Sequence, residues 1–361
     1  MFEKTVDSTS IHLAQVAQEP PSFGLITHAF DERYQSMCDI VMSQFDKEVQ
    51  RMGQAQLLFF VLLVLECVLA GVFLSLWGAT LSFALTLSSI FLTTFASFVT
   101  IIYLNTARTH RLIELRDRFL LSCRQYIGYQ EGNKSHHLTL AEMASRLAVD
   151  MADREYSYLS RLCVVEVFRS YVESISAWKH WRDVHNFRRM LLESAIDESL
   201  SLVRCDPLNI EVHASLANAY VLMASLFCDP SRSETFNFDD EHQDRWLPPG
   251  RKQPIMEKAF RDFSSRAVEE FQIISDFAPE DPWVHAQLAY SYHDLKMFPE
   301  EIAAYEALLE LCPEDHDARF RLGLLYFQQG SNAKGLEMYS RLKESCFSKA
   351  DVLITFYGKQ R

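Results

Sequence analysis

The stretch WVHAQLAYSYHDLKMFPEEIAAYEALLELCP, from Trp283 to Pro313, is followed by residues that repeat much of its pattern. Matching residues lie 34 positions apart: Leu288 and Leu322, Ala289 and Gly323, Tyr292 and Tyr326, Tyr305 and Tyr339, Leu308 and Leu342, and the closing prolines Pro279 and Pro313. A constant offset over several kinds of position predicts two helices per unit. Small residues let the two helices approach, leucines and tyrosines fill the space between them, and proline ends the second helix.

An earlier copy shares this register. Its first helix lies in HASLANAYVL, and its second lies in RAVEEFQIISDFAPED. The matching residues are Leu216, Ala217 and Tyr220, each 72 positions before its counterpart, and Ala267, Phe271 and Pro279, each 34 positions before its counterpart. Because the first-helix offset of 72 exceeds the second-helix offset of 34, we predict an insertion at about 229–254, between the two helices of this copy. One departure is Glu301, which stands where the second helix usually has alanine.

Both ends of the repeated region look incomplete. Upstream, ESAIDESLSLVRCDP closes at Pro207 and has Ala195 and Ile196 at the small and aliphatic positions. We expect the first helix of this half copy within YVESISAWKHWRDVHNF, which departs from the pattern. Downstream, FSKADVLITFYGKQR predicts one helix that caps the last hydrophobic face.

These features resemble the tetratricopeptide repeat (TPR) family. The resemblance implies an all-α solenoid over 139–361 whose first helices line a groove for a protein or peptide partner. The expected groove residues are Asn218, Trp283, Gln287, Tyr290, His293, Arg321, Phe327 and Gln328. The family's chaperone-tail binders clamp a carboxylate with paired lysines and asparagines. Only Asn218 and Arg321 suit that role here, so we do not expect such a clamp.

Aromatic residues dominate the expected groove instead. Trp283, Tyr290 and Phe327 suit an apolar peptide or helix laid against them. The alternative is that some of them pack against neighbouring repeats or the insertion, and the sequence leaves both interpretations open.

Two apolar runs, at 57–77 and 81–103, are each long enough to cross the roughly 30 Å of hydrocarbon in a bilayer. Only Gly78, Ala79 and Thr80 separate them, which predicts a transmembrane helical hairpin over 57–104 with Trp77 at its tip. Basic residues flank the hairpin and are absent from the tip: Arg33, Lys47, Arg51, Arg108, Arg111, Arg116 and Arg118. The positive-inside rule therefore predicts a multi-pass protein with both termini in the cytoplasm.

Glu66 lies near the middle of the first run, where an ionised carboxylate costs a few kcal/mol. It could mark an ion path. The interpretation we favour is a protonated carboxyl bonded to a hydroxyl of the second helix, or a contact in a homo-oligomer.

The flanks of the hairpin predict further helices. Residues 28–56 have apolar residues at helical spacing and lead into the first run, and 105–132 form a juxtamembrane helix after the second. Thr139 and Glu142 form a capping box that predicts the start of the soluble domain. Residues 1–27 are expected to be a flexible N-terminus, which could carry an export signal.

Composition narrows the function. The net charge of -13 argues against nucleic acid as a partner, and eight scattered cysteines without a CxxC pair indicate reduced thiols. No catalytic or nucleotide-binding motif is present, so we expect no enzyme activity and no cofactor. An acidic cluster in the insertion fits a solvated loop better than a metal site: Asp239, Asp240, Glu241, His242 and Asp244.

The sequence thus predicts a bacterial inner-membrane scaffold that recruits a protein through its TPR groove. The alternative is a type III secreted effector in a host vacuole membrane, because two close spans with a minimal turn resemble the bilobed segment of chlamydial inclusion membrane proteins. A third possibility is an enzyme with an unrecognised site in 139–185 or in the insertion.

Overall fold

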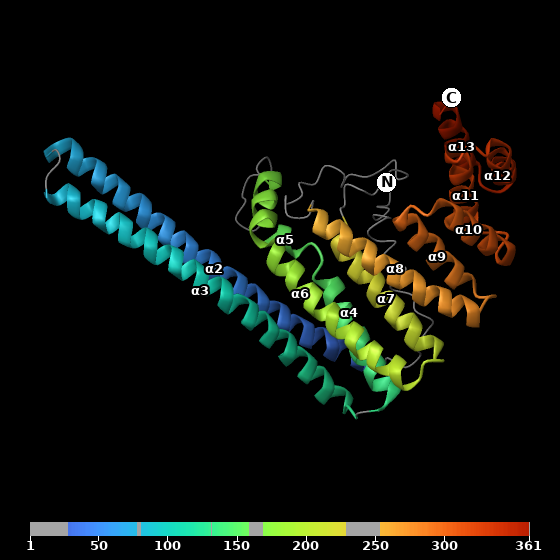
Figure 1. Ribbon diagram of the computed structural model, residues 1–361, viewed down its shortest axis with the longest axis horizontal. Helices are drawn as coiled ribbons and strands as arrows, with labels where there is room; N and C mark the ends of the chain where they lie inside the picture. The colour runs from blue at the N-terminus through green and yellow to red at the C-terminus, as the bar shows by residue number, and fades with distance from the viewer. Residues whose placement is uncertain (1–27, 78–80, 131, 159–168, 229–252, 361) are drawn as a thin grey trace. The chain divides into compact units, whose positions relative to one another are not determined.

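The computed structural model describes residues 28–77, 81–130, 132–158, 169–228 and 253–360, which form helices and short connections, with no strand among them (Figure 1). They divide into two compact units. Unit 1 contains Gly132–Ser145 and the residues from Leu192 onward, and unit 2 contains Gly24–Glu131 and Arg146–Leu191. Residues 146–191, which we expected in the repeat domain, therefore belong to the unit of the hairpin.

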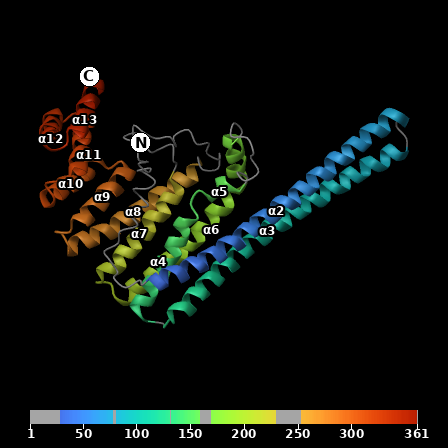
Figure 2. The ribbon, with the colours of Figure 1, turned by 180° about the vertical axis from the view of Figure 1, so that it is seen from behind.

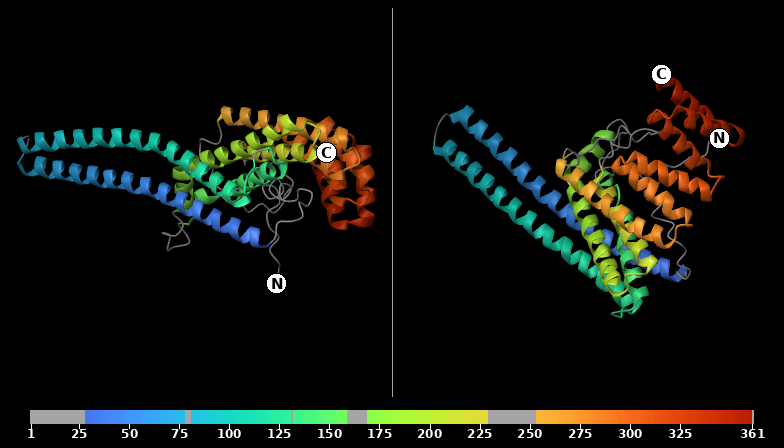
Figure 3. Two further views of the ribbon diagram at one scale, coloured as in Figure 1. Left: turned by 90° about the horizontal axis from the view of Figure 1, so that it is seen from below. Right: turned by 45° about the vertical axis from the view of Figure 1, so that its right-hand side comes forward.

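Unit 2 is built on two long antiparallel helices, α2 (His28–Trp77) and α3 (Leu81–Ile127), which lie side by side in every view (Figures 1, 2 and 3). The amphipathic segment 28–56 and the first apolar run form one uninterrupted helix, as predicted. The second run continues in the same way into the juxtamembrane segment. This segment ends as a helix at Ile127, because Gly128 takes a φ of 62°.

The polar ends of α2 and α3 have a buried core. The buried residues recur at helical spacing: Tyr34, Cys38, Val41, Phe45 and Val49 on α2, and Leu112, Leu115, Phe119 and Cys123 on α3. Helix α6 (Arg169–Cys205) adds Phe187, whose ring stacks on Phe45 with centroids 5.1 Å apart.

Charged groups tie α6 and the short helix α5 (Arg154–Ser157) to α2 and α3. Arg108 of α3 donates to Asp183 of α6 at 2.7 Å, and Asp183 is almost fully buried. Asp46 of α2 accepts from Arg154 at 3.1 Å and from the Tyr158 hydroxyl at 2.9 Å. These side chains hold α5 and the part of α6 around Asp183 against α2 and α3 within unit 2.

Along the apolar runs of α2 and α3, in contrast to the polar ends, large apolar side chains are exposed. They are Phe60, Val61, Leu62, Val64, Leu65, Val68, Leu69 and Val72 on α2, and Leu85, Leu87, Phe91, Leu92, Phe95, Phe98, Val99, Ile102 and Tyr103 on α3. By length and composition, Ala84–Ile127 could cross a membrane, with a mean hydropathy of 1.9 and none of its apolar window buried. The apolar part of α2, Phe59–Val72, is shorter.

A second helix passes the same test, but it lies in unit 1. Ile210–Phe227 has a mean hydropathy of 1.3, and 67% of it is buried inside the protein. Its burial identifies it as a core helix of the repeats.

Unit 1 is a TPR-like helical repeat. Its pairs are α7 (Ile210–Phe227) with α8 (Pro254–Phe277), α9 (Pro282–Leu295) with α10 (Phe298–Leu311), and α11 (His316–Gln328) with α12 (Asn332–Ser345). Each helix packs on the next, and α13 (Phe347–Gln360) packs on both α12 and α11. Helix α13 therefore lies where the sequence predicts a cap. Most of the predicted insertion lies outside the described residues, and α8 begins at its last position.

The repeat positions that we expected between helices are inside the protein. Buried among them are Leu216, Ala217, Tyr220, Ala267, Phe271, Leu288, Ala289, Tyr292, Tyr305, Leu322, Gly323 and Tyr326, whereas Tyr339 is half-buried. The small residues are required by close packing. A Cβ at Gly323 would lie 2.8 Å from a methyl group of Leu353, which α13 places there.

The first helix of the half copy was wrongly predicted. YVESISAWKHWRDVHNF lies within α6, which continues unbroken through ESAIDESLSLVRC, so the two segments cannot fold back on each other. The helix that contacts the end of α6 is α4 (Lys134–Asp150): His137 Nδ1 lies 2.7 Å from Glu198 Oε2, and Leu138 packs with Leu202 and Val212. The half copy therefore has a first helix, separated from its second by a long insertion.

The predicted capping box is also wrong. Helix α4 begins at Lys134, where the Asn133 side chain accepts from the Ser135 backbone N–H at 3.2 Å. Thr139 lies inside the helix and donates to the Ser135 carbonyl at 2.7 Å.

The connection from the second helix of one pair to the first helix of the next pair has the same design at three places. We call this connection the joint. The closing prolines are Pro207, Pro279 and Pro313, and two residues later Asn209, Asp281 and Asp315 cap α7, α9 and α11 through their side chains. Six residues after each proline, His213, His285 and Arg319 donate to its carbonyl oxygen. The two histidine contacts measure 2.9 and 2.8 Å. The joint therefore satisfies both helix ends with side chains at fixed positions.

We predict that Asp281→Ala destabilises the protein by about 1 kcal/mol, because the Trp283 backbone N–H loses its acceptor at 3.0 Å. The neighbouring exposed residue provides the control, Glu280→Ala, which should be close to neutral. Thermal unfolding of the full chain in detergent, followed by circular dichroism, measures both. Equal melting temperatures for the two variants would contradict the capping role.

Gly335→Ala should destabilise the protein by about 1–3 kcal/mol through overpacking. A Cβ at Gly335 would lie 2.6 Å from Cδ1 of Phe327, whose ring is held in the core by α13. Gly358→Ala is the matched helical control, because a Cβ at Gly358 meets nothing within 4 Å. The prediction is wrong if both variants unfold at the wild-type urea concentration.

Candidate partner-binding groove

The predicted groove residues lie on the first helices of the three pairs, α7, α9 and α11. Asn218, Trp283, Tyr290 and Arg321 are half-buried, and His293 and Gln328 are exposed. Gln287 and Phe327 are only 4% and 2% exposed, so the prediction that they face a partner is corrected.

Phe327 is buried because the capping helix α13 covers the side that would otherwise face solvent. The Tyr357 ring of α13 lies 4.7 Å from the Phe327 ring, centroid to centroid, and Leu353 belongs to the same cluster. Packing against a neighbouring helix, which the sequence left as an alternative, thus holds for this aromatic residue.

Trp283 both packs against a neighbouring helix and keeps a surface open to a partner. Its ring meets Phe271 of α8 edge-on at 5.8 Å between centroids, while the residue keeps part of its surface open. Tyr290 is similar, since its ring meets Tyr305 edge-on at 6.5 Å. Both side chains are anchored by packing, and each still offers an aromatic surface.

A polar pair lies beside these rings. His293 Nδ1 at the end of α9 lies 3.0 Å from Glu301 Oε1 in the first turn of α10. Glu301 is 2% exposed, and its second oxygen has no partner among the described residues. The departure from alanine at this repeat position therefore has a structural role, because the carboxylate holds the histidine.

The pair sets the charge of the groove. The hydrogen bond to Glu301 raises the pKa of His293, and the charges of Glu301 and Asp294 add to it, against burial and the charge of Arg321. Burial raises the pKa of Tyr290 and Tyr305, so both hydroxyls stay protonated at neutral pH. The centre of the groove thus presents aromatic surface next to an imidazolium-favouring site.

The hairpin contains a half-buried acid that stands out in the sequence, Glu66. Glu66 Oε1 accepts hydrogen bonds from the Ser89 and Thr93 hydroxyls of α3, each at 2.9 Å. The expected contact with the second helix is present, and the membrane role of Glu66 stays a prediction. The Trp77 side chain and Gly78 lie outside the described residues.

The described residues offer little reactive chemistry elsewhere. Within them, no group of three or more His, Cys, Asp or Glu could hold a metal ion, and the acidic cluster at 239–244 lies outside them. Burial raises the pKa of Cys38 to about 11 and that of Cys123 to about 12, which keeps both thiols protonated and unreactive at neutral pH.

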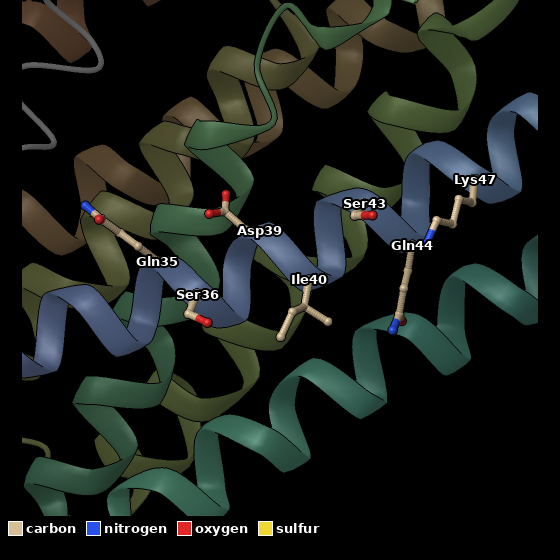
Figure 4. A pocket seen from close by; sticks show the side chains of 7 residues that line it. All are labelled: Gln35, Ser36, Asp39, Ile40, Ser43, Gln44 and Lys47. Atoms are coloured by element: carbon tan, nitrogen blue, oxygen red, sulfur yellow. The ribbon is translucent and has the colours of Figure 1, made fainter.

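An open hollow runs along the polar part of α2 (Figure 4). It is lined by Gln35, Ser36, Asp39, Ile40, Ser43, Gln44 and Lys47, all from this one helix. Figure 4 shows Ile40 and Gln44 extending from α2 towards α3. A ligand site needs convergent groups from several elements, so we assign no function to this hollow.

Comparisons with known proteins give a structural likeness and no match in sequence. No family model matches the chain, and no curated protein matches it. Among solved structures, it is similar to a thermophilic TPR protein of Thermus thermophilus, with 16% identity and a TM-score of 0.29. The match covers 61% of this chain and 97% of that one.

At this TM-score the likeness carries no argument, so the repeat assignment rests on helix bounds and register. The resemblance of the hairpin to chlamydial inclusion membrane proteins gains no support from these comparisons.

Replacing Glu301 tests the polar pair. Because Glu301 raises the pKa of His293, the pair should stabilise the protein below about pH 6.5 and lose this effect as pH rises through the raised pKa. Relative to Glu301→Ala, the wild-type melting temperature should therefore fall with rising pH. Unfolding from about pH 5.5 to 9 measures the difference, with His293→Gln as the matched variant. A difference independent of pH would contradict the pairing.

Proposed function

We propose that the chain is a non-enzymatic membrane adaptor. Its apolar hairpin anchors it in a bilayer, and the first-helix face of unit 1 binds a protein or peptide partner. The repeat fold supports the second part, since TPR-like folds generally mediate protein–protein interaction.

The observation that carries the anchor is the exposure of apolar side chains along α2 and α3. Phe91 and Leu92 are 75% and 67% exposed, and their neighbours on both helices are exposed as well. A patch of this length is unfavourable in water, whereas hydrocarbon solvates it without penalty. Helix α7 also passes the length and hydropathy test for a span, yet most of it is buried, so the exposure on α3 is not a general property of this chain's apolar helices.

The hydrogen bonds of Glu66 also suit a hairpin placed in hydrocarbon. In hydrocarbon a polar side chain needs a partner on the facing helix, and Glu66 has two hydroxyls there. Basic residues on both flanks support a topology with both ends in the cytoplasm, which favours a bacterial inner membrane.

The surface left open in the groove defines the partner. Trp283 and Tyr290 offer anchored aromatic faces, and His293 and Arg321 add donors beside them. This combination suits an extended peptide or an amphipathic helix with apolar anchors and a polar or acidic side. Gln287 and Phe327 have no part in it, because both are buried.

One experiment tests anchor and groove together. Benzoylphenylalanine replaces Tyr290 in the full chain, cells are irradiated, and the membranes are washed with alkali. We expect the chain and a crosslinked partner to stay in the membrane pellet. The control carries the same label in place of Glu269, an exposed residue of the second helix α8. Chain in the soluble fraction would refute the anchor, and equal adducts from both positions would refute the groove.

A further inference from the structure

Helix α6 exposes a narrow apolar face near its start. Tyr171, Ile175 and Trp178 are 71%, 55% and 63% exposed, and their spacing of four and three residues places them on one side of the helix. Residues on the other side are buried in unit 2: Ser176, Ala177, His180, Trp181 and Val184. A tryptophan, a tyrosine and an isoleucine thus stand in a row on a helix whose opposite side is already packed.

Contacts within unit 2 fix the direction in which α6 runs. Phe187 stacks on Phe45 of α2, and Asp183, which lines one small cavity together with Val49 of α2, binds Arg108 of α3. Going from Phe187 to Asp183, α6 therefore advances along α2 towards the apolar runs. Figures 1 and 2 agree, because α6 begins at its end nearer the tip of the hairpin.

The helix rise places the exposed face at the edge of the apolar runs. From Asp183 to Tyr171, α6 advances by about 18 Å at 1.5 Å per residue. The same rise separates Val49 from the start of the first apolar run by about 12 Å, and Arg108 from Tyr103 by about 8 Å. Even with α6 inclined to the hairpin, its first turns reach the level at which α2 and α3 would enter hydrocarbon.

The residues in the first turns of α6 are of the kinds that favour the membrane–water interface. Tryptophan and tyrosine concentrate at the membrane–water interface, where their rings meet the headgroup region. The segment 169–182 carries Arg169, Lys179 and Arg182 against one acid, Glu173, although the whole chain has a net charge of -13. A local basic excess around an aromatic stripe is suited to a surface of anionic lipid headgroups.

We propose that the Tyr171, Ile175 and Trp178 face of α6 lies in the headgroup region of the same bilayer that holds the hairpin. This inference rests on the proposed membrane anchor. The interface then contacts unit 2 at a second place, beside the two helices that cross it, and this contact restrains the tilt of the hairpin. A protein partner or a second copy of the chain on this face is the alternative that the test must separate.

Tryptophan fluorescence in vesicles tests the proposal on the full chain, which has five tryptophans. Variant A carries Trp77→Phe, Trp246→Phe and Trp283→Phe, and its matched control adds Trp178→Phe, so their difference reports Trp178 alone. Trp181 stays in both and is buried, so its emission also shows whether unit 2 is folded. Variant B keeps only Trp77, at the tip, and reports the anchor.

The vesicles contain anionic lipid and phospholipids brominated either near the headgroup or near the end of the acyl chain. We expect shallow bromine to quench Trp178 about twofold more than deep bromine, and acrylamide in the water to quench it less than in detergent. In variant B, bromolipid quenching of Trp77 shows that the hairpin is inserted.

The outcomes separate the two claims. If Trp77 is quenched and Trp178 stays open to acrylamide, the anchor stands and this inference is overturned. If Trp178 is shielded from acrylamide but no bromolipid quenches it, a protein covers the face, and the inference is again overturned. If neither tryptophan is quenched by bromolipid, the anchor itself fails and the inference fails with it.

Discussion

The repeats of unit 1 depend on the joint between one helix pair and the next. At each joint the carbonyl oxygen of the closing proline lies past the end of a helix, where no helical N–H can bond to it. A side chain six residues later donates the missing hydrogen bond. His213 shows how strong this demand is. Burial opposes its charge, yet hydrogen bonds to Glu270 and to the Pro207 carbonyl still raise the pKa of its imidazole. Because the joint recurs in register, the same groups connect each second helix to the first helix that follows it.

Two carboxylates, each with a buried oxygen, show how polar groups are accommodated between packed helices. Glu301 and Glu66 each have one oxygen bonded to the neighbouring helix and a second oxygen without a partner among the described residues. A half-satisfied buried carboxylate costs stability. Each is placed where two helices must keep a fixed register, which the bond provides: α9 with α10 in the repeats, and α2 with α3 in the hairpin.

Local periodicity explains which parts of the fold could be predicted. The helix pairs from α7 to α12 follow from matching residues 34 positions apart, or 72 apart for the first helix α7, because each pair repeats the same packing problem. The first pair could not be found that way, since a long segment that belongs to unit 2 separates α4 from the end of α6. In the groove, Trp283 and Tyr290 were predictable from register, but the burial of Phe327 depends on a tyrosine thirty residues later, in α13. The joint has a signal in the sequence as well, because a His or Arg recurs six residues after each closing proline, apart from the small and aromatic repeat positions.

Helices α3 and α7 show why apolar length alone does not decide where a helix resides. Both are long and apolar enough to cross a bilayer. Neighbouring helices cover most of α7, so its apolar surface contributes to the core of the repeats. Among the described helices, α2 is the one that packs along α3 most extensively, and two helices cannot hide each other's circumference. We propose that a bilayer covers the surface they leave open, because it would be continuous around both helices, whereas a protein partner would have to enclose them on every side.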